Sequence, residues 1–275
     1  MKLLNFGCGH TFHRDWINID LVSASPEVQE HDIRKNLPYP DEYFDACYSS
    51  HVIEHMKKNE SARAIAECYR ILKPQGIVRI VVPDLESIVR AYLSSLERAV
   101  SGVKGAESDY NWMTIELLDQ VARNSSGGEM STYLSNPNIH NKDFVKSRIG
   151  NQAEHYWKNE LNSKSLWEKI SSKRLSWFWE RSRQILAQSL CLATGGNQAQ
   201  QAFKEGLFRN SGEIHRWMYD RYSLQRLLEQ SGFIDVRVCH ADESFIPDFN
   251  KYNLDRSEGK IRKPDSLFME AFKPK

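Results

Sequence analysis

The chain of 275 residues has few cysteines, no long apolar run and almost no net charge. No run of 18 apolar residues exists, so no membrane-spanning helix is expected. Lysine and arginine number 37 against 36 acidic residues, which argues against a general nucleic-acid-binding protein. The apolar opening Met1–Leu4 is too short for a secretory signal.

The five cysteines are scattered and include no CxxC pair: Cys8, Cys47, Cys68, Cys191 and Cys239. This pattern argues against a disulfide framework and against a structural zinc site, and it indicates a reducing compartment. We therefore expect a cytoplasmic protein without a metal site.

Apolar runs and period-two alternation predict a series of short strands in the first third of the chain. These strands are expected at 3–6, 17–21, 28–33, 44–50 and 77–82. Apolar residues at helical spacing predict a helix over 60–72. The alternation of strand, turn and helix predicts an α/β fold with a parallel sheet. The same pattern returns near the end of the chain, with a helix over 223–230 and strands over 233–240 and 266–272.

A segment without convincing strands, residues 101–210, interrupts this pattern after a predicted helix over 84–100. We predict a core made of 1–100 and 211–275, with 101–210 as a helical cap over the substrate. Aromatic and basic residues over 167–181 recur at helical spacing, which suits either packing on the core, a substrate platform or a peripheral membrane contact. The pairs Gly127–Gly128 and Gly195–Gly196 are predicted hinges or loop tips.

Gly7, Cys8 and Gly9 form a glycine turn directly after the first predicted strand. In open α/β sheets, ligands bind at this edge. Asp20 ends the second strand, and an ionised carboxylate there suits a ribose diol. The nicotinamide-dinucleotide fingerprint is incomplete, because Phe12 replaces its third glycine and Asp20 follows Gly9 by only 11 positions, against about 20. The first helix must then be very short, which favours a nucleoside ligand without phosphates.

Asp32 and Ile33 end the third predicted strand and suit an adenine ring. The Asp32 carboxylate can accept a hydrogen bond from the exocyclic amine, while Ile33 packs on the ring. A surface carboxylate is the alternative interpretation.

Six stretches occur in an order that resembles one known family. They are NFGCG (5–9), NID (18–20), LPYPDEYFD (37–45), SSHVIEH (49–55), RILKPQG (70–76) and VPDLE (82–86). They resemble class I S-adenosylmethionine-dependent methyltransferases of the type-11 kind. They also resemble a subgroup with a shortened first helix, found among bacterial proteins that modify polysaccharides or small molecules. The resemblance covers about 1–86 and 211–273.

The resemblance implies a Rossmann-like sheet with strand order 3-2-1-4-5-7-6 and an antiparallel last strand. It also implies S-adenosylmethionine as the cofactor. The residues that it assigns to cofactor binding are Asn5, Gly7, Cys8, Gly9, Asp20, Leu21, Asp32, Ile33, Ser49, Ser50 and His51. Asn5 departs from the family, in which Asp or Glu is common at this position.

A hydroxyl acceptor would need a base, and histidine is the usual choice near neutral pH. The candidate catalytic residues are His215, where the insertion returns to the core, His51 at the active edge, and Asp84 beyond the fifth strand. His55, beside Glu54, is expected to be structural.

Together these features predict methyl transfer from S-adenosylmethionine to an oxygen of a sugar or another small-molecule acceptor. The expected partner is a small molecule or a glycan, not a nucleic acid. Two alternatives remain open at this stage: a nicotinamide-dependent oxidoreductase, and a non-catalytic S-adenosylmethionine-binding or scaffold protein.

Overall fold

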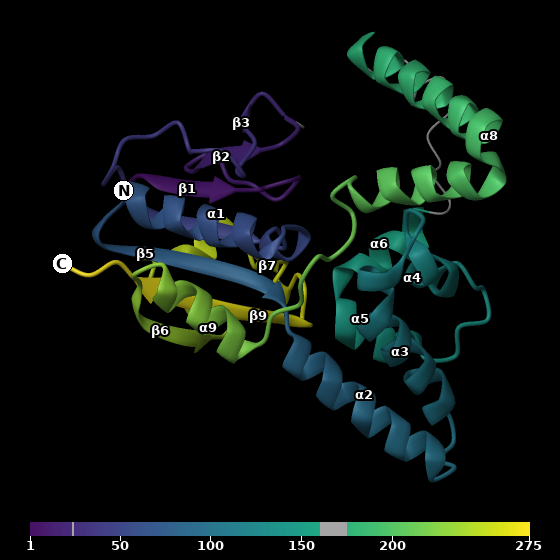
Figure 1. Cartoon of the computed structure of the whole chain (residues 1–275). Helices are drawn as coiled ribbons and strands as arrows, with labels where there is room; N and C mark the ends of the chain where they lie inside the picture. The colour runs from purple at the N-terminus through teal and green to yellow at the C-terminus, as the bar shows by residue number, and fades with distance from the viewer. Residues whose placement is uncertain (24, 160–174) are drawn as a thin grey trace.

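The computed structural model describes residues 1–23, 25–159 and 175–275. A seven-stranded sheet lies at its centre (Figure 1). In the order of the sheet its strands are β3 (Val28–Glu30), β2 (Ile17–Asp20), β1 (Leu3–Phe6), β4 (Phe44–Ser50), β5 (Leu72–Pro83), β9 (Ser266–Phe272) and β6 (Ile234–Cys239). The first five strands are parallel, and β9 is antiparallel to both neighbours. Because β9 is the seventh sheet strand along the chain, the predicted Rossmann-like order and its antiparallel last strand are confirmed.

The third strand is shorter than the predicted 28–33, because the chain turns at Asp32. The backbone N–H of Lys35 donates to the Asp32 carbonyl at 2.9 Å, and that of Arg34 donates to the Asp32 carboxylate at 3.1 Å. A carboxylate that bonds the backbone two residues on is typical of a turn. The predicted helix over 60–72 is α1 (Lys58–Ile71), which ends where Leu72 pairs with Phe44 of β4.

Two apolar clusters cover the two faces of the sheet. The cluster on one face includes side chains of α1 and of α9 (Arg221–Gln230). The other face is covered by Trp16 and by the chain over 241–254, which contains the short helix η2 (Phe249–Tyr252). No helix occurs between β1 and β2, so the first crossover of this sheet is a loop over 7–16. Both chain ends lie at the same side of the molecule (Figure 1).

The insertion has an apolar core of its own beside the sheet (Figure 1). It is built from five helices: α2 (Leu85–Val100), α3 (Ala106–Ala122), α4 (Gly128–Leu134), α5 (Lys142–Ile149) and α6 (Asn151–Asn159). Trp112 and Met113 are fully buried in this core, and Ile88 of α2 joins them. The helix α2 therefore packs with the insertion, although it follows β5 directly.

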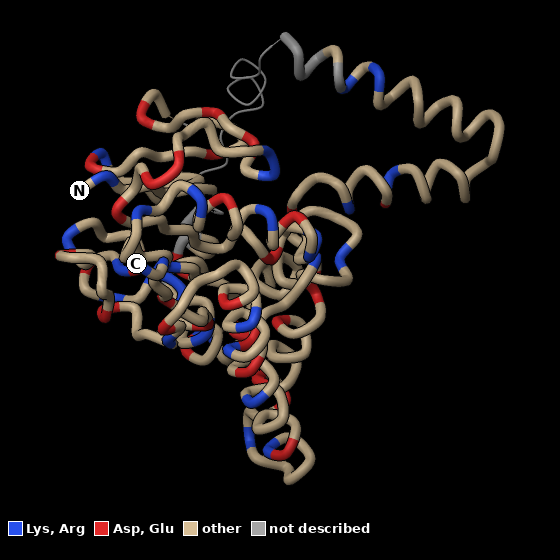
Figure 2. The backbone as a smooth tube through the Cα atoms, turned by 60° about the vertical axis from the view of Figure 1, so that its left-hand side comes forward, with Lys and Arg blue, Asp and Glu red and all other residues tan. Residues whose placement is uncertain are grey.

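Helix α8 (Leu175–Arg209) extends away from the rest of the structure (Figure 1). It consists of two helical arms that meet at Gly196, whose φ of 70° and ψ of −168° are not helical. Gly196, one of the glycines predicted to be a hinge or loop tip, thus lies at the kink between the two arms. Figure 2 shows few charged residues along α8, and the sequence has none from 184 to 203. Most of the predicted stripe over 167–181 lies outside the described residues.

No helix among the described residues is long and apolar enough to cross a membrane. Acidic and basic residues are interspersed over the sheet and its covering helices (Figure 2). This mixture agrees with the net charge of +1.

Candidate functional site

A first cavity of about 250 Å³ lies at the carboxyl ends of β1 and β4. The strand order reverses between these strands, and open α/β sheets bind ligands at such a reversal. Six of the eleven residues assigned to the cofactor line it: Asn5, Gly7, Cys8, Gly9, Ser50 and His51. The structure therefore brings together the glycine turn and the end of the fourth strand.

Glycine is suited to the two positions of the turn for different structural reasons. Gly7 has a φ of 65°, and a Cβ there would lie 2.3 Å from a methyl group of Val52. Gly9 has a φ of 52°, but no atom lies within 4 Å of the position that its Cβ would take. Gly7 thus permits close packing of the chain, whereas Gly9 leaves free space in the cavity wall. This free space at Gly9 allows a ligand to approach the backbone closely.

Asp20 fixes the glycine turn from the neighbouring strand. Its Oδ2 accepts a hydrogen bond from the Gly9 backbone N–H at 2.8 Å, and its Oδ1 accepts one from Val22 at 3.3 Å. Asp20 does not line the first cavity, and Leu21 beside it is 53% exposed. Each carboxylate oxygen keeps further acceptor capacity for a ligand at the edge of the turn.

Asn5 organises the loop that replaces the first helix. Its side chain is buried and donates to the Thr11 carbonyl and to Oδ1 of Asn18, both at 3.1 Å. The Asn18 amide in turn donates to the carbonyls of His13 and Trp16. An amide can donate and accept in this network, whereas an ionised carboxylate can only accept. This explains Asn at a position where acidic residues are common in the family it resembles.

Three further assigned residues, like Asp20 and Leu21, do not line the first cavity. Asp32 forms a two-pronged ion pair with Arg34 at 2.8 and 2.9 Å, which lowers the pKa of Asp32. Ile33 packs against the main apolar cluster of the sheet. The Ser49 side chain is buried, and its hydroxyl has no partner among the described residues. The adenine assignment of Asp32 and Ile33 remains a prediction.

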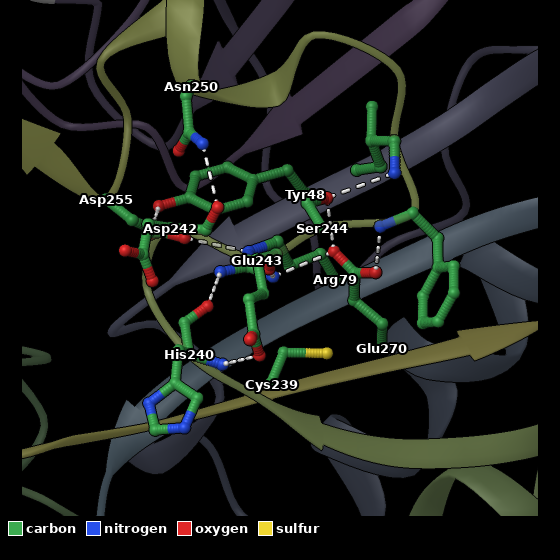
Figure 3. Close-up of polar contacts among 12 residues, drawn as sticks. Tyr48, Arg79, Cys239, His240, Asp242, Glu243, Ser244, Asn250, Asp255 and Glu270 are labelled. Atoms are coloured by element: carbon green, nitrogen blue, oxygen red, sulfur yellow. Dashed lines mark hydrogen bonds and ion pairs between the residues drawn. The ribbon is translucent and has the colours of Figure 1, made fainter.

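A buried ionic network supports the wall of the first cavity (Figure 3). Arg79 of β5 is fully buried and donates to Asp255 at 2.7 Å and to Glu270 at 2.8 Å. Tyr48 donates to the same Asp255 at 2.6 Å, and both residues line the cavity. Arg79 also donates to the carbonyls of His240 and Glu243, which ties the loop after β6 to the sheet.

The sequence analysis missed this network. Its members come from three distant parts of the chain, so no local spacing reveals the contacts. A signal was present, however. Arg79 interrupts the apolar buried run 77–83 of β5, and Glu270 interrupts the apolar buried run 267–271 of β9; a buried charge needs a partner.

A second cavity of about 260 Å³ lies beside the first, between the sheet edge and the insertion. The two cavities share His51 and Lys263. The insertion supplies more than half of the lining of the second cavity: Gln120, Arg123, Gly127, Met130, Ser131, Leu134, Ile149, Gln152 and Tyr156. The insertion thus reaches the carboxyl edge of the sheet.

Three imidazoles surround the buried carboxylate of Glu54 at the boundary of the two cavities. His51 has a φ of 56°, an uncommon backbone conformation for histidine that is often found at functional sites. Its Nδ1 lies 3.3 Å from Glu54 Oε1, and His55 Nε2 lies 4.0 Å from the same oxygen. The rings of His55 and His215 meet edge to face at 4.7 Å.

His215 is held between the core and the insertion. Its backbone N–H donates to the carbonyl of Gln120 in α3 at 2.8 Å, and its side chain is 3% exposed. Burial lowers the pKa of His215 to about 3 and that of His51 to about 4. Both rings are therefore neutral at pH 7, and the lowered pKa values make both of them weak bases.

Asp84 lies outside the linings of both cavities. It is the N-cap of α2, and its carboxylate accepts a hydrogen bond from the backbone N–H of Glu86 at 3.0 Å. Burial raises the pKa of this carboxyl. The described contacts of Asp84 are those of a helix cap, and its catalytic assignment remains a prediction.

Comparison with known proteins connects this site to one family. Residues 4–80 match the Methyltransf_11 family, described as a methyltransferase domain. The matched segment runs from β1 into β5 and includes the glycine turn, Asp20 and the histidines that follow β4. No curated protein matches the chain at a significant level.

Several solved structures resemble the chain. The [4+2]-cyclase SpnF has 29% identity over 30% of this chain and 38% of its own, with a TM-score of 0.25. A SAM-dependent methyltransferase from Archaeoglobus fulgidus has 13% identity over 99% of this chain and 86% of its own, with a TM-score of 0.39. A possible histamine N-methyltransferase from Thermotoga maritima has 12% identity over 99% and 81%, with a TM-score of 0.37. The chain thus spans well under half of the length of SpnF.

Proposed function

We propose that the protein is an S-adenosylmethionine-dependent methyltransferase that methylates an oxygen of a sugar or another small polar acceptor. One observation carries the proposal: two cavities meet at His51 and Lys263. The first lies at the glycine turn, inside the segment that matches a methyltransferase domain. The second is lined mainly by the insertion. Donor and acceptor would therefore meet at the shared wall.

In this proposal the first cavity holds the cofactor. The backbone of Gly7–Gly9 and the end of β4 at Ser50 and His51 would bind its methionine part, and Asp20 would bind its ribose. The open space at Gly9 and the missing first helix fit a nucleoside ligand without a pyrophosphate. When bound, S-adenosylmethionine supplies an already activated methyl group.

The second cavity would hold the acceptor. Its lining is rich in polar groups, among them Gln120, Arg123 and Gln152, which suits a molecule with several hydroxyl groups. The insertion would orient the acceptor and exclude water, and orientation alone is worth about 7–11 kcal/mol in favourable cases. His51 and His215 line this cavity and are the proposed acceptors of the hydroxyl proton. Residues 101–210 would then act as a substrate cap on a core of 1–100 and 211–275.

Two alternatives are weaker. A nicotinamide-dependent oxidoreductase would need a helix N-terminus at the glycine turn for the pyrophosphate, and none follows β1. A non-catalytic binding protein would need no second polar cavity beside the first.

A cytoplasmic location also belongs to the proposal and is supported by the five free cysteines.

The test is a binding and turnover experiment with a matched pair of variants. Calorimetry should show that S-adenosylmethionine binds and that NAD does not. Labelled S-adenosylmethionine and a panel of sugars should then give S-adenosylhomocysteine and a labelled product. Gly9→Val should abolish binding, because a branched side chain enters the free space of the turn and resists a positive φ.

Gly102→Val is the control, because Gly102 has a φ of 71° and equally free surroundings far from the cavity. It carries the same backbone strain and should bind the cofactor normally. Binding of NAD in place of S-adenosylmethionine would contradict the proposal, and so would equal effects of the two valine variants.

A further inference from the structure

The cluster formed by Glu54, His55 and His215 contains a buried charge without a visible partner. The Glu54 side chain is fully buried, and neither carboxylate oxygen accepts a hydrogen bond from any residue that the structure describes. A buried carboxylate whose oxygens have no donor is destabilising, so a further partner for Glu54, such as a cation, is expected.

No protein cation supplies that partner in the described part of the chain. His51 Nδ1 lies 3.3 Å from Glu54 Oε1 but makes no hydrogen bond with it. Lys263 lines the second cavity nearby, but it forms no ion pair with Glu54 among the described residues.

The hydrogen bond of His55 to the backbone indicates which of its ring nitrogens carries the proton. Its Nδ1 lies 3.1 Å from the backbone carbonyl of Ile214, which can only accept, so Nδ1 carries the proton. In the neutral ring, Nε2 then presents a lone pair to Glu54 Oε1 across 4.0 Å. Two acceptors face one another over a gap that is too long for a hydrogen bond. Around a tetrahedral zinc-like ion with bonds of about 2.0–2.2 Å, two ligand atoms lie about 3.3–3.6 Å apart, so a closing movement of about 0.5 Å would bring both atoms to the ion.

We propose that Glu54, His55 and His215 bind a divalent transition-metal cation of the zinc class. One ligand atom from each of the three residues lies within 4.8 Å of the others. Three protein ligands leave a coordination position open, as in catalytic zinc sites. The bond from His55 to Ile214 orients the ligand ring in the manner typical of metal-binding histidines.

The position of the proposed metal site beside the second cavity suggests a role in the reaction. His55 and His215 line the second cavity, so the open position of the metal would face the acceptor. A metal-bound hydroxyl loses its proton more readily. His51, which lines both cavities and is not a ligand, would accept that proton, and His215 would bind the metal in place of acting as a base. This role rests on the proposed methyl transfer, whereas binding of the cation does not. No metal is expected from the sequence, because Glu54 and His55 are about 160 residues from His215.

The experiment measures metal binding by the full-length chain without cofactor or acceptor. The protein is treated with a chelator, dialysed and titrated with Co²⁺, followed by visible absorption, and with Zn²⁺, followed by calorimetry. We expect one ion per chain and the intense visible bands of a low-symmetry Co²⁺ site. His55→Ala and Glu54→Gln should each weaken binding by at least about 100-fold, since even outer-shell substitutions cost 10- to 100-fold.

His240→Ala is the matched control, because His240 is exposed and lies outside the cluster. It should bind both ions like the unmodified protein. Zn²⁺ should also raise the melting temperature of the unmodified protein and of this control, but not that of the two ligand variants. If Glu54→Gln does not fold, His55→Ala still decides, because the His55 side chain is only partly buried.

Absence of binding would overturn the proposal, as would binding that both ligand variants retain. Neither outcome affects the proposed methyl transfer, which the binding of S-adenosylmethionine tests separately.

Discussion

At the scale of single residues, the Asp20 carboxylate links the end of β2 to the glycine turn. Because it already accepts the Gly9 N–H, its removal would loosen the turn and also take away a ribose acceptor. Asp20→Ala should therefore lower the affinity for S-adenosylmethionine by about 10- to 150-fold, the equivalent of about 1.5–3 kcal/mol for a charged hydrogen bond. Calorimetry gives the affinity directly.

Asp15→Ala serves as the control, because Asp15 is exposed on the preceding loop. If the Asp20 variant, the Asp15 variant and the unmodified protein bind S-adenosylmethionine with the same affinity, Asp20 does not take part in cofactor binding.

Asp265 gives a prediction on pH and stability. Burial, aided by the nearby Glu116, raises the pKa of Asp265 to about 6. In the unfolded chain it would titrate near its ordinary value of about 3.9. The folded state thus holds an extra proton between about pH 4 and pH 6, so stability falls as the pH rises through this window. The loss is at most about 3 kcal/mol and is complete above pH 6.

Asp265→Asn keeps the shape but removes this titration. Urea unfolding at several pH values should show the variant gaining stability over the unmodified protein as the pH rises from 4 to 7. Asp248→Asn, at an exposed position, should show no such gain. A difference between Asp265→Asn and the unmodified protein that does not change with pH would contradict the raised pKa.

At the scale of secondary-structure elements, Arg79 joins β5 to β9 and to the loop after β6. Arg79→Met should lower the free energy of unfolding by about 3–5 kcal/mol, because it leaves Asp255 and Glu270 as unpaired buried charges. Chemical denaturation measures the change.

Two further variants test the cause of that loss. Arg90→Met, on an exposed part of α2, should change stability by less than about 0.5 kcal/mol. Adding Asp255→Asn and Glu270→Gln to Arg79→Met should recover part of the lost stability. A triple variant that is less stable than Arg79→Met alone would show that packing, not charge, is responsible.

At the scale of the whole molecule, the proposal requires the insertion to shape the acceptor cavity and not the cofactor cavity. Gln152 is an exposed residue of α6 that lines only the second cavity. Gln152→Trp should partly fill this cavity and lower kcat/KM for the acceptor on the order of 10²-fold through misplacement. The affinity for S-adenosylmethionine should not change.

The exposed Gln201 provides the control, since Gln201→Trp adds the same side chain on α8, a helix that lines neither cavity. A loss of cofactor affinity in Gln152→Trp would mean that the two cavities do not bind separate ligands. An unchanged kcat/KM for the acceptor in the same variant would show that the insertion does not form part of the acceptor site.

Local sequence determined much of this protein. Strand periodicity and the turns between strands are properties of neighbouring residues, so the limits of β4 and β9 and the break at Gly196 follow from sequence alone. The glycine turn after β1 was predictable for the same reason, since its backbone needs positive φ at Gly7 and Gly9.

Only the tertiary structure decided which distant residues meet. The position of α2 against the insertion, the pairing of Arg79 with Asp255 and Glu270, and the approach of His215 to Glu54 all join residues far apart in the chain. No local period encodes such contacts, because they arise when the sheet and the helical core close over buried polar groups that water can no longer reach. The sequence therefore determined the edge of the sheet where chemistry takes place, and the fold determined which side chains surround it.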